Sequence, residues 1–266
     1  MHRDAPTYRY KAGHVREIQV RRMMQLARNL PANSTYCEIG MNGGHSLVAM
    51  LLAHLTLTAH VFDLLALGYS QSVVQLIETR FRNRVHFHKG HSSQTVRAWH
   101  SKLSAMSGST CHQRSGNANF EDVSYLPYCP TCDMVFVDGD HTFSGSMLDL
   151  RHMRNLTKLG APVVVDDVQV SPGKALRVLS NHGLATIVEM YGPYPPAHRF
   201  NPCSRDYANP QDCHTHVAAY LSLHNITDNT KTGRGPEQYH RYCKNLEPMC
   251  LPWGFAVASF YQNVTS

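Results

Sequence analysis

Short apolar runs bounded by turn-forming residues alternate along this chain with stretches in which apolar residues recur at helical spacing. The short runs predict seven strands, at 35–39, 60–63, 84–88, 133–137, 161–165, 184–190 and 255–261. The periodic stretches predict helices at 11–29, 46–54, 70–82, 144–155 and 173–182. Met134–Val137 is apolar throughout, which is typical of a strand buried on both faces of a parallel sheet.

The regular alternation of strands and helices predicts an α/β fold built on a doubly wound, mostly parallel sheet. No periodic crossover helix joins the last two strands, so we expect them to pair as a hairpin and to make one strand antiparallel. Between them the composition changes, because Pro, Asn, Asp, His and four cysteines dominate. We expect one domain over residues 1–266, with a helix at 11–29, a core at 36–190, a loop-rich insertion at 192–252 and a last strand at 255–261.

The most informative stretch is Tyr36–Ser46, which runs from an apolar strand through glycines into a helix. Such a turn can hold a nucleotide, because glycine lacks a Cβ and the first N–H groups of a helix are free donors. Asn42 stands where a dinucleotide fingerprint needs glycine, and the Lys-Ser/Thr pair of a P-loop is missing. The pattern Glu-x-Gly-x-x-x-Gly-x-Ser, from Glu38 to Ser46, resembles motif I of class I S-adenosylmethionine-dependent methyltransferases.

Acidic residues follow the ends of several predicted strands, which is where ligands bind in open α/β sheets. Asp63 ends the second strand, 23 residues after Gly40, and a carboxylate there can accept both ribose hydroxyls of a nucleoside. Asp138 and the Asp166–Asp167 pair end two strands that we expect to be neighbours. Three converging carboxylates repel one another, and a hard divalent cation such as Mg²⁺ is their simplest stabiliser.

Two segments, Val-Asp-Gly-Asp-His at 137–141 and Val-Val-Asp-Asp at 164–167, resemble the metal-dependent O-methyltransferases of the macrocin type, which tailor macrolide and aminocoumarin sugars. The resemblance covers roughly residues 36–190 and implies a Rossmann-like fold with S-adenosylmethionine and Mg²⁺ as cofactors. It implies metal binding by Asp138, Asp166 and Asp167, and a general base at Asp140, with His141 as its competitor. The cofactor contacts that it implies are Glu38, Gly40, Gly43, Gly44, Ser46, Asp63, Ser92 and Asp138.

The expected reaction is transfer of a methyl group to a hydroxyl of a small molecule or glycan. In that reaction the metal acts as a Lewis acid on the acceptor hydroxyl, and the general base takes its proton. The insertion at 192–252 has no counterpart in the shorter catechol-type enzymes, so the resemblance does not identify the acceptor. Two alternatives remain: a secreted or lumenal binding protein that kept the fold without catalysis, and a metal-dependent hydrolase, for which no nucleophile is evident.

The composition argues against nucleic-acid and membrane partners. The formal net charge of +6 is spread along the chain, without the Lys/Arg run that is typical of a nucleic-acid patch. No apolar run reaches the length of a membrane span, and the polar start, Met1–Asp4, does not resemble a signal peptide. A homodimer is compatible with the sequence.

Cysteines and glycosylation sequons favour the secretory lumen or secretion over the cytoplasm. The eight cysteines are an even number, which fits disulfides, and four Asn-x-Ser/Thr sequons fit a glycoprotein: Asn33, Asn155, Asn225 and Asn263. The motif from Cys129 to Cys132 leaves three interpretations open, namely a structural disulfide, unpaired thiols, or a zinc or redox site. A redox motif of this kind should open a helix, whereas this one leads directly into a predicted strand.

Overall fold

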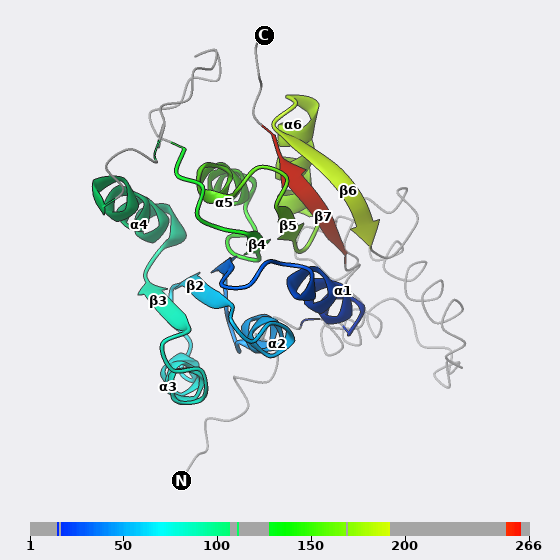
Figure 1. The fold of residues 1–266 in the computed structure, drawn as a ribbon. Helices are drawn as coiled ribbons and strands as arrows, with labels where there is room; N and C mark the ends of the chain where they lie inside the picture. The colour runs from blue at the N-terminus through cyan, green and yellow to red at the C-terminus, as the bar shows by residue number, and fades with distance from the viewer. Residues whose placement is uncertain are drawn as a thin grey trace, which may run out of the picture. The chain divides into compact units, whose positions relative to one another are not determined.

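Strands and helices alternate along the described residues as the apolar pattern predicts (Figure 1). The structure is a computed structural model, and it describes residues 15, 17–106, 111, 128–168, 170–191 and 254–261. Its helices are α1 (Glu17–Arg28), α2 (His45–Ala53), α3 (Ser70–Arg80), α4 (Ser92–Met106), α5 (Phe143–Leu156) and α6 (Ser171–Asn181). Its strands are β1 (Thr35–Ile39), β2 (Thr58–Asp63), β3 (Val85–Lys89), β4 (Met134–Val137), β5 (Pro162–Val165), β6 (Ala185–Tyr191) and β7 (Phe255–Phe260).

The seven described strands form one sheet in the order β3-β2-β1-β4-β5-β7-β6. The pairs β1–β2, β1–β4, β2–β3 and β4–β5 are parallel, whereas β7 runs antiparallel to both β5 and β6. The predicted α/β fold is therefore confirmed, with a seven-stranded, mostly parallel sheet and one antiparallel strand. The predicted pairing of the last two strands is confirmed as well.

Burial along the strands follows their positions in the sheet. All four residues of central β4 and all six of β7 are buried, whereas the edge strand β6 alternates between its two faces and exposes Val188. Helices α4, α5 and α6 pack on the face that carries Val135 and Val137, and together they form the larger part of the core. The opposite residues of these strands face the layer that contains α1 and α2 (Figure 1).

Helix α4 was not predicted, because the sequence interpretation placed residues 90–93 in a loop and began a long polar segment at 104. Its buried residues Val96, Trp99 and His100 do recur at helical spacing. Ser, Thr and His surround them, and these residues favour helices only weakly. Tertiary burial of this one stripe outweighs the weak local preference, so the helix becomes evident only once the core is assembled.

Apart from Gly254, the described residues belong to the compact unit formed by Gly13–Tyr191 and Phe255–Ser266. The predicted helix at 11–29 is observed as the shorter α1, Glu17–Arg28: Val15 and Asn29 are not helical, and residues 11–14 and 16 lie outside the described residues. The expected insertion at 192–252 lies wholly outside them. Within the described part of the chain, no helix is long and apolar enough to cross a membrane.

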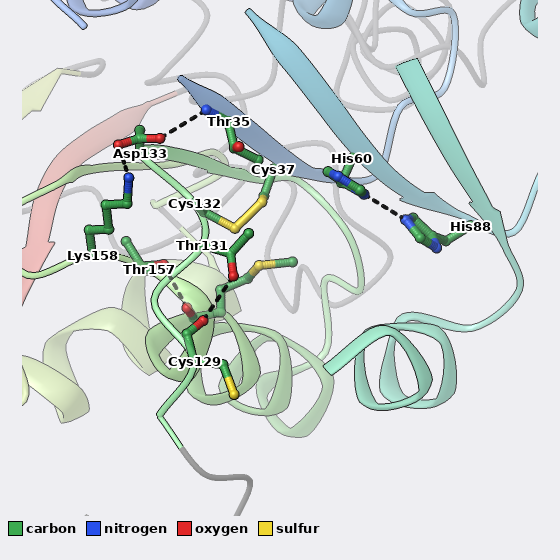
Figure 2. Close-up of a disulfide and its surroundings, with 11 residues drawn as sticks. Thr35, Cys37, His60, His88, Cys129, Thr131, Cys132, Asp133, Thr157 and Lys158 are labelled. Atoms are coloured by element: carbon green, nitrogen blue, oxygen red, sulfur yellow. Dashed lines mark hydrogen bonds and ion pairs between the residues drawn. A yellow bond between two sulfur atoms is a disulfide. The ribbon is translucent and has the colours of Figure 1, made fainter. Parts of the chain in front are cut away.

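Two disulfides involve the Cys129–Cys132 motif, but neither joins its two cysteines to each other. Cys132 pairs with Cys37 of β1, and Cys129 pairs with Cys111. Figure 2 shows the first of these bonds between β1 and the segment that enters β4, where Asp133 also binds Thr35 and Lys158. The structural-disulfide interpretation is therefore correct for both cysteines. The unpaired-thiol, zinc and redox interpretations do not fit, since neither sulfur is a free thiol.

Three histidines pack together where β2 and β3 face α4. The ring of His60 stacks on His86 at 4.7 Å between centroids and on Trp99 at 4.3 Å, and His60 Nδ1 lies 3.1 Å from His88 Nε2 (Figure 2). Burial, with the nearby charges of His86 and His88, lowers the pKa of His60 to about 3. Burial also lowers the pKa of His88 to about 4, helped by His86 and Lys102. Both rings are therefore neutral in the folded protein at neutral pH.

We expect His60 and His88 to lower the free energy of unfolding when the pH falls from 8 to 5. An unfolded histidine takes up a proton near pH 6.5, whereas these two stay neutral in the folded protein, so at these two positions the unfolded state binds more protons. Their combined contribution should be about 2–4 kcal/mol at pH 5 relative to pH 8. Urea unfolding of the wild type and of His60→Leu/His88→Leu at both pH values isolates it, because Glu38 and His141, whose pKa values are raised on folding, act in the opposite direction in both proteins. Relative to the wild type, the variant should gain this amount of stability when the pH is lowered, and an equal change in both proteins would contradict the assignment.

Candidate active site

Apart from Ser92, which follows β3, the predicted site residues lie at or just after the carboxyl ends of four adjacent strands, β2, β1, β4 and β5. Asp63 is the last residue of β2, the glycine turn follows β1, Asp138 follows β4, and the Asp166–Asp167 pair follows β5. This arrangement arises because consecutive parallel strands with crossover helices all present their carboxyl ends at one edge of the sheet. The prediction that Asp138 and the aspartate pair end neighbouring strands is confirmed.

The glycine turn after β1 is fixed by close packing within the protein. Gly40 has a positive φ of 84°, and its Cα lies so close to the backbone carbonyl of Asp138 that a Cβ would overlap it. Gly44 has a φ of 75°, and a Cβ there would lie 2.8 Å from Ile77 Cδ1. A Cβ at Gly43 would lie 2.8 Å from the His45 ring. These glycines thus bring the turn against β4 and α3, which places the first candidate cofactor residues beside Asp138.

The N-terminus of α2 opens at this turn without a side-chain cap. Gly44 is the N-cap residue and makes no side-chain hydrogen bond, so the first N–H groups of the helix are available to a ligand. Asp63 lies across the turn and accepts hydrogen bonds from the backbone N–H groups of Met41 at 2.7 Å, Asn42 at 3.2 Å and Leu65 at 2.6 Å. A carboxylate has about four acceptor positions, so Asp63 orders the turn and keeps capacity for a hydroxyl.

Glu38 is completely buried and connects β1 with α2. Its Oε1 accepts a hydrogen bond from the Ser46 hydroxyl, while Oε2 has no partner among the described residues. Burial raises the pKa of Glu38 to about 8, although the bond from Ser46 opposes the rise. Both predicted cofactor residues are therefore located behind the turn, where they brace the strand against the helix.

Asp138, His141 and Asp167 come together at the ends of β4 and β5. His141 Nε2 lies 3.3 Å from Asp138 Oδ1, and His141 Nδ1 lies 3.2 Å from Asp167 Oδ2. The hydrogen bond with Asp138 is the main reason that the pKa of His141 is raised to about 9, so its ring is a cation at neutral pH. Burial raises the pKa of Asp138, against the lowering effect of His141. A positive charge between these two carboxylates therefore stabilises the cluster.

The donor atoms of this cluster fit a divalent cation. One ligand atom each from Asp138, His141 and Asp167 lies within 4.8 Å of the others. Carboxylate oxygens with an imidazole nitrogen suit Mg²⁺ less well than an all-oxygen set, but they suit Mn²⁺ and other transition ions. The sequence places Asp166 in this set beside Asp138 and Asp167, and that placement stays a prediction; the structure adds His141 as a further candidate ligand.

Asp166 is 6% exposed, and its Oδ1 accepts a hydrogen bond of 2.9 Å from the N–H of Asp167. Burial raises its pKa well above the usual range, and the charges of Asp138 and Asp167 add to the rise. Asp166 therefore belongs to the same charged cluster, and its carboxyl group lies deeper in the protein than those of its neighbours.

Asp140 and Ser92 both contact α5 or its first turn. Asp140 Oδ1 accepts a hydrogen bond of 2.8 Å from the N–H of Thr142, and its carboxylate packs against Gly145. Ser92 donates a hydrogen bond of 2.6 Å to Oδ1 of Asp149, whose Oδ2 lies 3.5 Å from the N–H of Asp140. Asp140, the predicted base, thus lies just before α5. Ser92, a predicted cofactor contact, is hydrogen-bonded to the same helix.

Sequence interpretation missed two buried polar residues near this site, Asp149 and Gln19. Asp149 is 1% exposed within the apolar face of α5, and it supports both Ser92 and the Asp138–Asp140 turn. Gln19 is 0% exposed on α1 and influences Asp166. A polar residue at a position where the helical pattern expects an apolar one was the available signal in both cases.

Comparison with known proteins shows what the part of the chain that carries this site is similar to. Residues 37–168 match a family model described as a methyltransferase domain, and every predicted site residue falls within them. A search of curated proteins gives no match.

Two solved structures resemble the chain in fold. Cofactor-bound Rv0187 from MTB superposes with a TM-score of 0.53 at 15% identity, covering 94% of this chain and 83% of that one. The O-methyltransferase from Bacillus cereus in complex with SAH superposes with a TM-score of 0.51 at 11% identity, covering 93% and 83%. At such identities the likeness shows the fold alone, which is Rossmann-like.

Proposed function

We propose, from the premise that residues 37–168 form a class I methyltransferase domain, that this protein transfers the methyl group of S-adenosylmethionine to a hydroxyl of a small molecule or sugar. The observation that carries the proposal is the cluster of Asp138, His141 and Asp167, which lies directly beside the glycine turn after β1. A donor site and a charged acceptor site are thereby adjacent on one edge of the sheet, which is what transfer between two bound molecules requires.

On the donor side, the chain offers groups that match a nucleoside with an amino-acid tail. The uncapped N–H groups of α2 suit a carboxylate, and the Asp63 carboxylate suits ribose hydroxyls. Glu38 and Ser46 hold the turn that presents these groups. Ser92, the first residue of α4, binds Asp149 of α5, and this pair is the proposed border of the adenine site.

On the acceptor side, Asp138 and Asp167 would hold a divalent cation, and the buried carboxyl group of Asp166 next to Asp167 would be available as a further ligand once ionised. Such a cation, when bound, supplies Lewis-acid chemistry that lowers the pKa of an acceptor hydroxyl. The side chain of His141 is about half exposed and faces both carboxylates. A cation bound beside it would lower its raised pKa and so free a ring nitrogen to take the hydroxyl proton. The carboxylate of Asp140 instead binds the first turn of α5, which argues for a structural role.

We expect His141→Gln and Asp140→Asn to differ in kind. His141→Gln should lower kcat about 100-fold and change the pH dependence of kcat, because it removes the proposed proton acceptor. Asp140→Asn should mainly lower stability, by about 1 kcal/mol, because it weakens the hydrogen bond from the N–H of Thr142, the N-cap residue of α5. Transfer of labelled methyl from the cofactor to a panel of phenols, catechols and sugars, with Mg²⁺, with Mn²⁺ and with chelator, provides the assay. A larger loss of kcat in Asp140→Asn than in His141→Gln would indicate that Asp140 is the general base.

The same assay separates catalysis from binding alone. Stabilisation of the fold by S-adenosylmethionine in a thermal-shift experiment would indicate a real cofactor site. Stabilisation without transfer to any acceptor in the panel would favour the alternative, a non-catalytic binding protein. Transfer undiminished by chelator would reject the metal while leaving methyl transfer in place.

We further propose that the chain matures in the secretory lumen. Two disulfides support this, because such bonds persist in oxidising compartments. The exposed sequon residue Asn33, at a turn with a positive φ of 61°, leaves room for a glycan. The sequon at Asn155 is a poorer candidate, since its Thr157 is completely buried.

A further inference from the structure

Gln19 is a polar residue on the buried face of α1. Its companions on the buried face of α1 are Met23 and Ala27, one and two turns later, and all three are 0% exposed. Such a buried position favours an apolar residue, because an amide loses its hydrogen bonds to water when it is buried. A glutamine here therefore needs a hydrogen-bond partner inside the protein.

No such partner is found among the described residues. Neither Oε1 nor Nε2 of Gln19 makes a hydrogen bond there, although both atoms are shielded from solvent. Buried amide groups without partners are rare in folded proteins, because the lost hydrogen bonds to water are not replaced. The ligand-free protein therefore carries an unfavourable contribution at Gln19 that a ligand-bound form can relieve.

The amide of Gln19 lies beside the Asp166 carboxyl group. It is near enough to stabilise the charged form of Asp166, and it opposes the effects of Asp138 and Asp167 on that group. It does not reach hydrogen-bond geometry with Asp166. A small movement of the carboxyl group would close this gap.

Helix α1 is held in place at this level by an ion pair to the edge of the sheet. Arg22, one turn after Gln19, binds the carboxylate of Glu189 on β6 through two nitrogens, and the Tyr191 hydroxyl donates to the same carboxylate at 2.6 Å. The side chains of Arg22 and Glu189 are 21% and 27% exposed, so the pair is partly shielded from water. The ion pair thus fixes the position of α1, and with it the position of Gln19 beside Asp166.

We propose that Gln19 is a positioning residue of the cation site, whose amide N–H donates to one oxygen of Asp166 and turns the other toward a divalent cation held by Asp138 and Asp167. This inference rests on the metal site in the proposed function. An amide suits the role because it donates a hydrogen bond without adding a fourth negative charge to Asp138, Asp166 and Asp167. A bound cation would favour the ionised form of Asp166, which can accept the hydrogen bond that the buried amide lacks.

The test is the affinity for Mn²⁺ alone, measured by calorimetry and by the loss of the free Mn²⁺ resonance signal, together with the melting temperature of the metal-free protein. Gln19→Met keeps the length of the side chain and removes the amide. We expect it to bind Mn²⁺ at least about 10-fold more weakly, as is typical when a residue that orients a metal ligand is lost. We also expect its metal-free form to melt no lower than the wild type, because the unpaired amide is gone.

Met23→Leu is the matched control, since it changes the same buried face one turn away and should leave Mn²⁺ affinity unaltered. Gln19→Leu serves as a second apolar variant where Gln19→Met does not fold. Mn²⁺ affinity within twofold of the wild type in either variant, with binding lost in Asp138→Asn, would overturn the role of Gln19 and leave the cation site standing. Absence of Mn²⁺ binding by the wild type would remove the cation site itself, and the role of Gln19 with it.

Discussion

Asp138→Asn should lower methyl transfer by at least about 100-fold, because it removes one of two carboxylates around which the acceptor side is built. The substitution keeps the shape of the side chain. Burial and the charge of Asp167 raise the pKa of Asp138, so a neutral side chain removes an unfavourable charge there, although it also weakens the ion pair with His141. Binding of S-adenosylmethionine should be retained, since the glycine turn and Asp63 do not depend on this charge. Transfer of labelled methyl and calorimetry with the cofactor measure the two effects separately.

Asp133→Asn is the matched control, because Asp133 lies just before β4, at the opposite end of that strand from Asp138. It binds Lys158 and the N–H of Thr35, so its loss should reduce stability and leave the chemistry intact. Full activity in Asp138→Asn, or equal loss of activity in both variants, would contradict the assignment of the acceptor site. Loss of cofactor binding in Asp138→Asn would instead indicate that Asp138 contributes to the S-adenosylmethionine site.

Removing the Cys37–Cys132 disulfide should destabilise the protein by about 2–5 kcal/mol. The two cysteines are 95 residues apart in the sequence, and both are completely buried between β1 and β4. Loop-closure entropy predicts about 4.7 kcal/mol for a link of that span and about 3.2 kcal/mol for the 18-residue span of Cys111–Cys129. The Cys37→Ala/Cys132→Ala variant should therefore lose more stability than Cys111→Ala/Cys129→Ala.

Urea unfolding of both variants and of the wild type, with and without reductant, measures these differences. Reductant should lower the stability of the wild type and have a smaller effect on each variant. Equal stability of the wild type in both conditions would contradict the disulfides and remove the main support for maturation in an oxidising compartment. A larger loss in Cys111→Ala/Cys129→Ala would show that loop span does not govern the effect.

The order of elements could be predicted because it depends on local properties. Apolar runs such as Met134–Val137 are too short for helices and too apolar for loops, so they specify strands wherever they are placed. The lack of a periodic helix after β6 likewise indicated the antiparallel pairing of β7. The positions of Asp63 and Asp138 at strand ends followed from the same pattern, since each acid comes directly after its apolar run.

The amino-acid sequence by itself thus determined the sheet, its helices apart from α4, and the edge at which the charged residues gather. Only the tertiary structure decided that Cys37 pairs with Cys132, that His141 stands between Asp138 and Asp167, and that Gln19 lies against Asp166. The physical reason is the separation of the interacting residues along the sequence. Strand and helix preferences act between near neighbours in the sequence. These contacts instead join distant residues, which the parallel strand connections bring together and whose side-chain directions depend on packing.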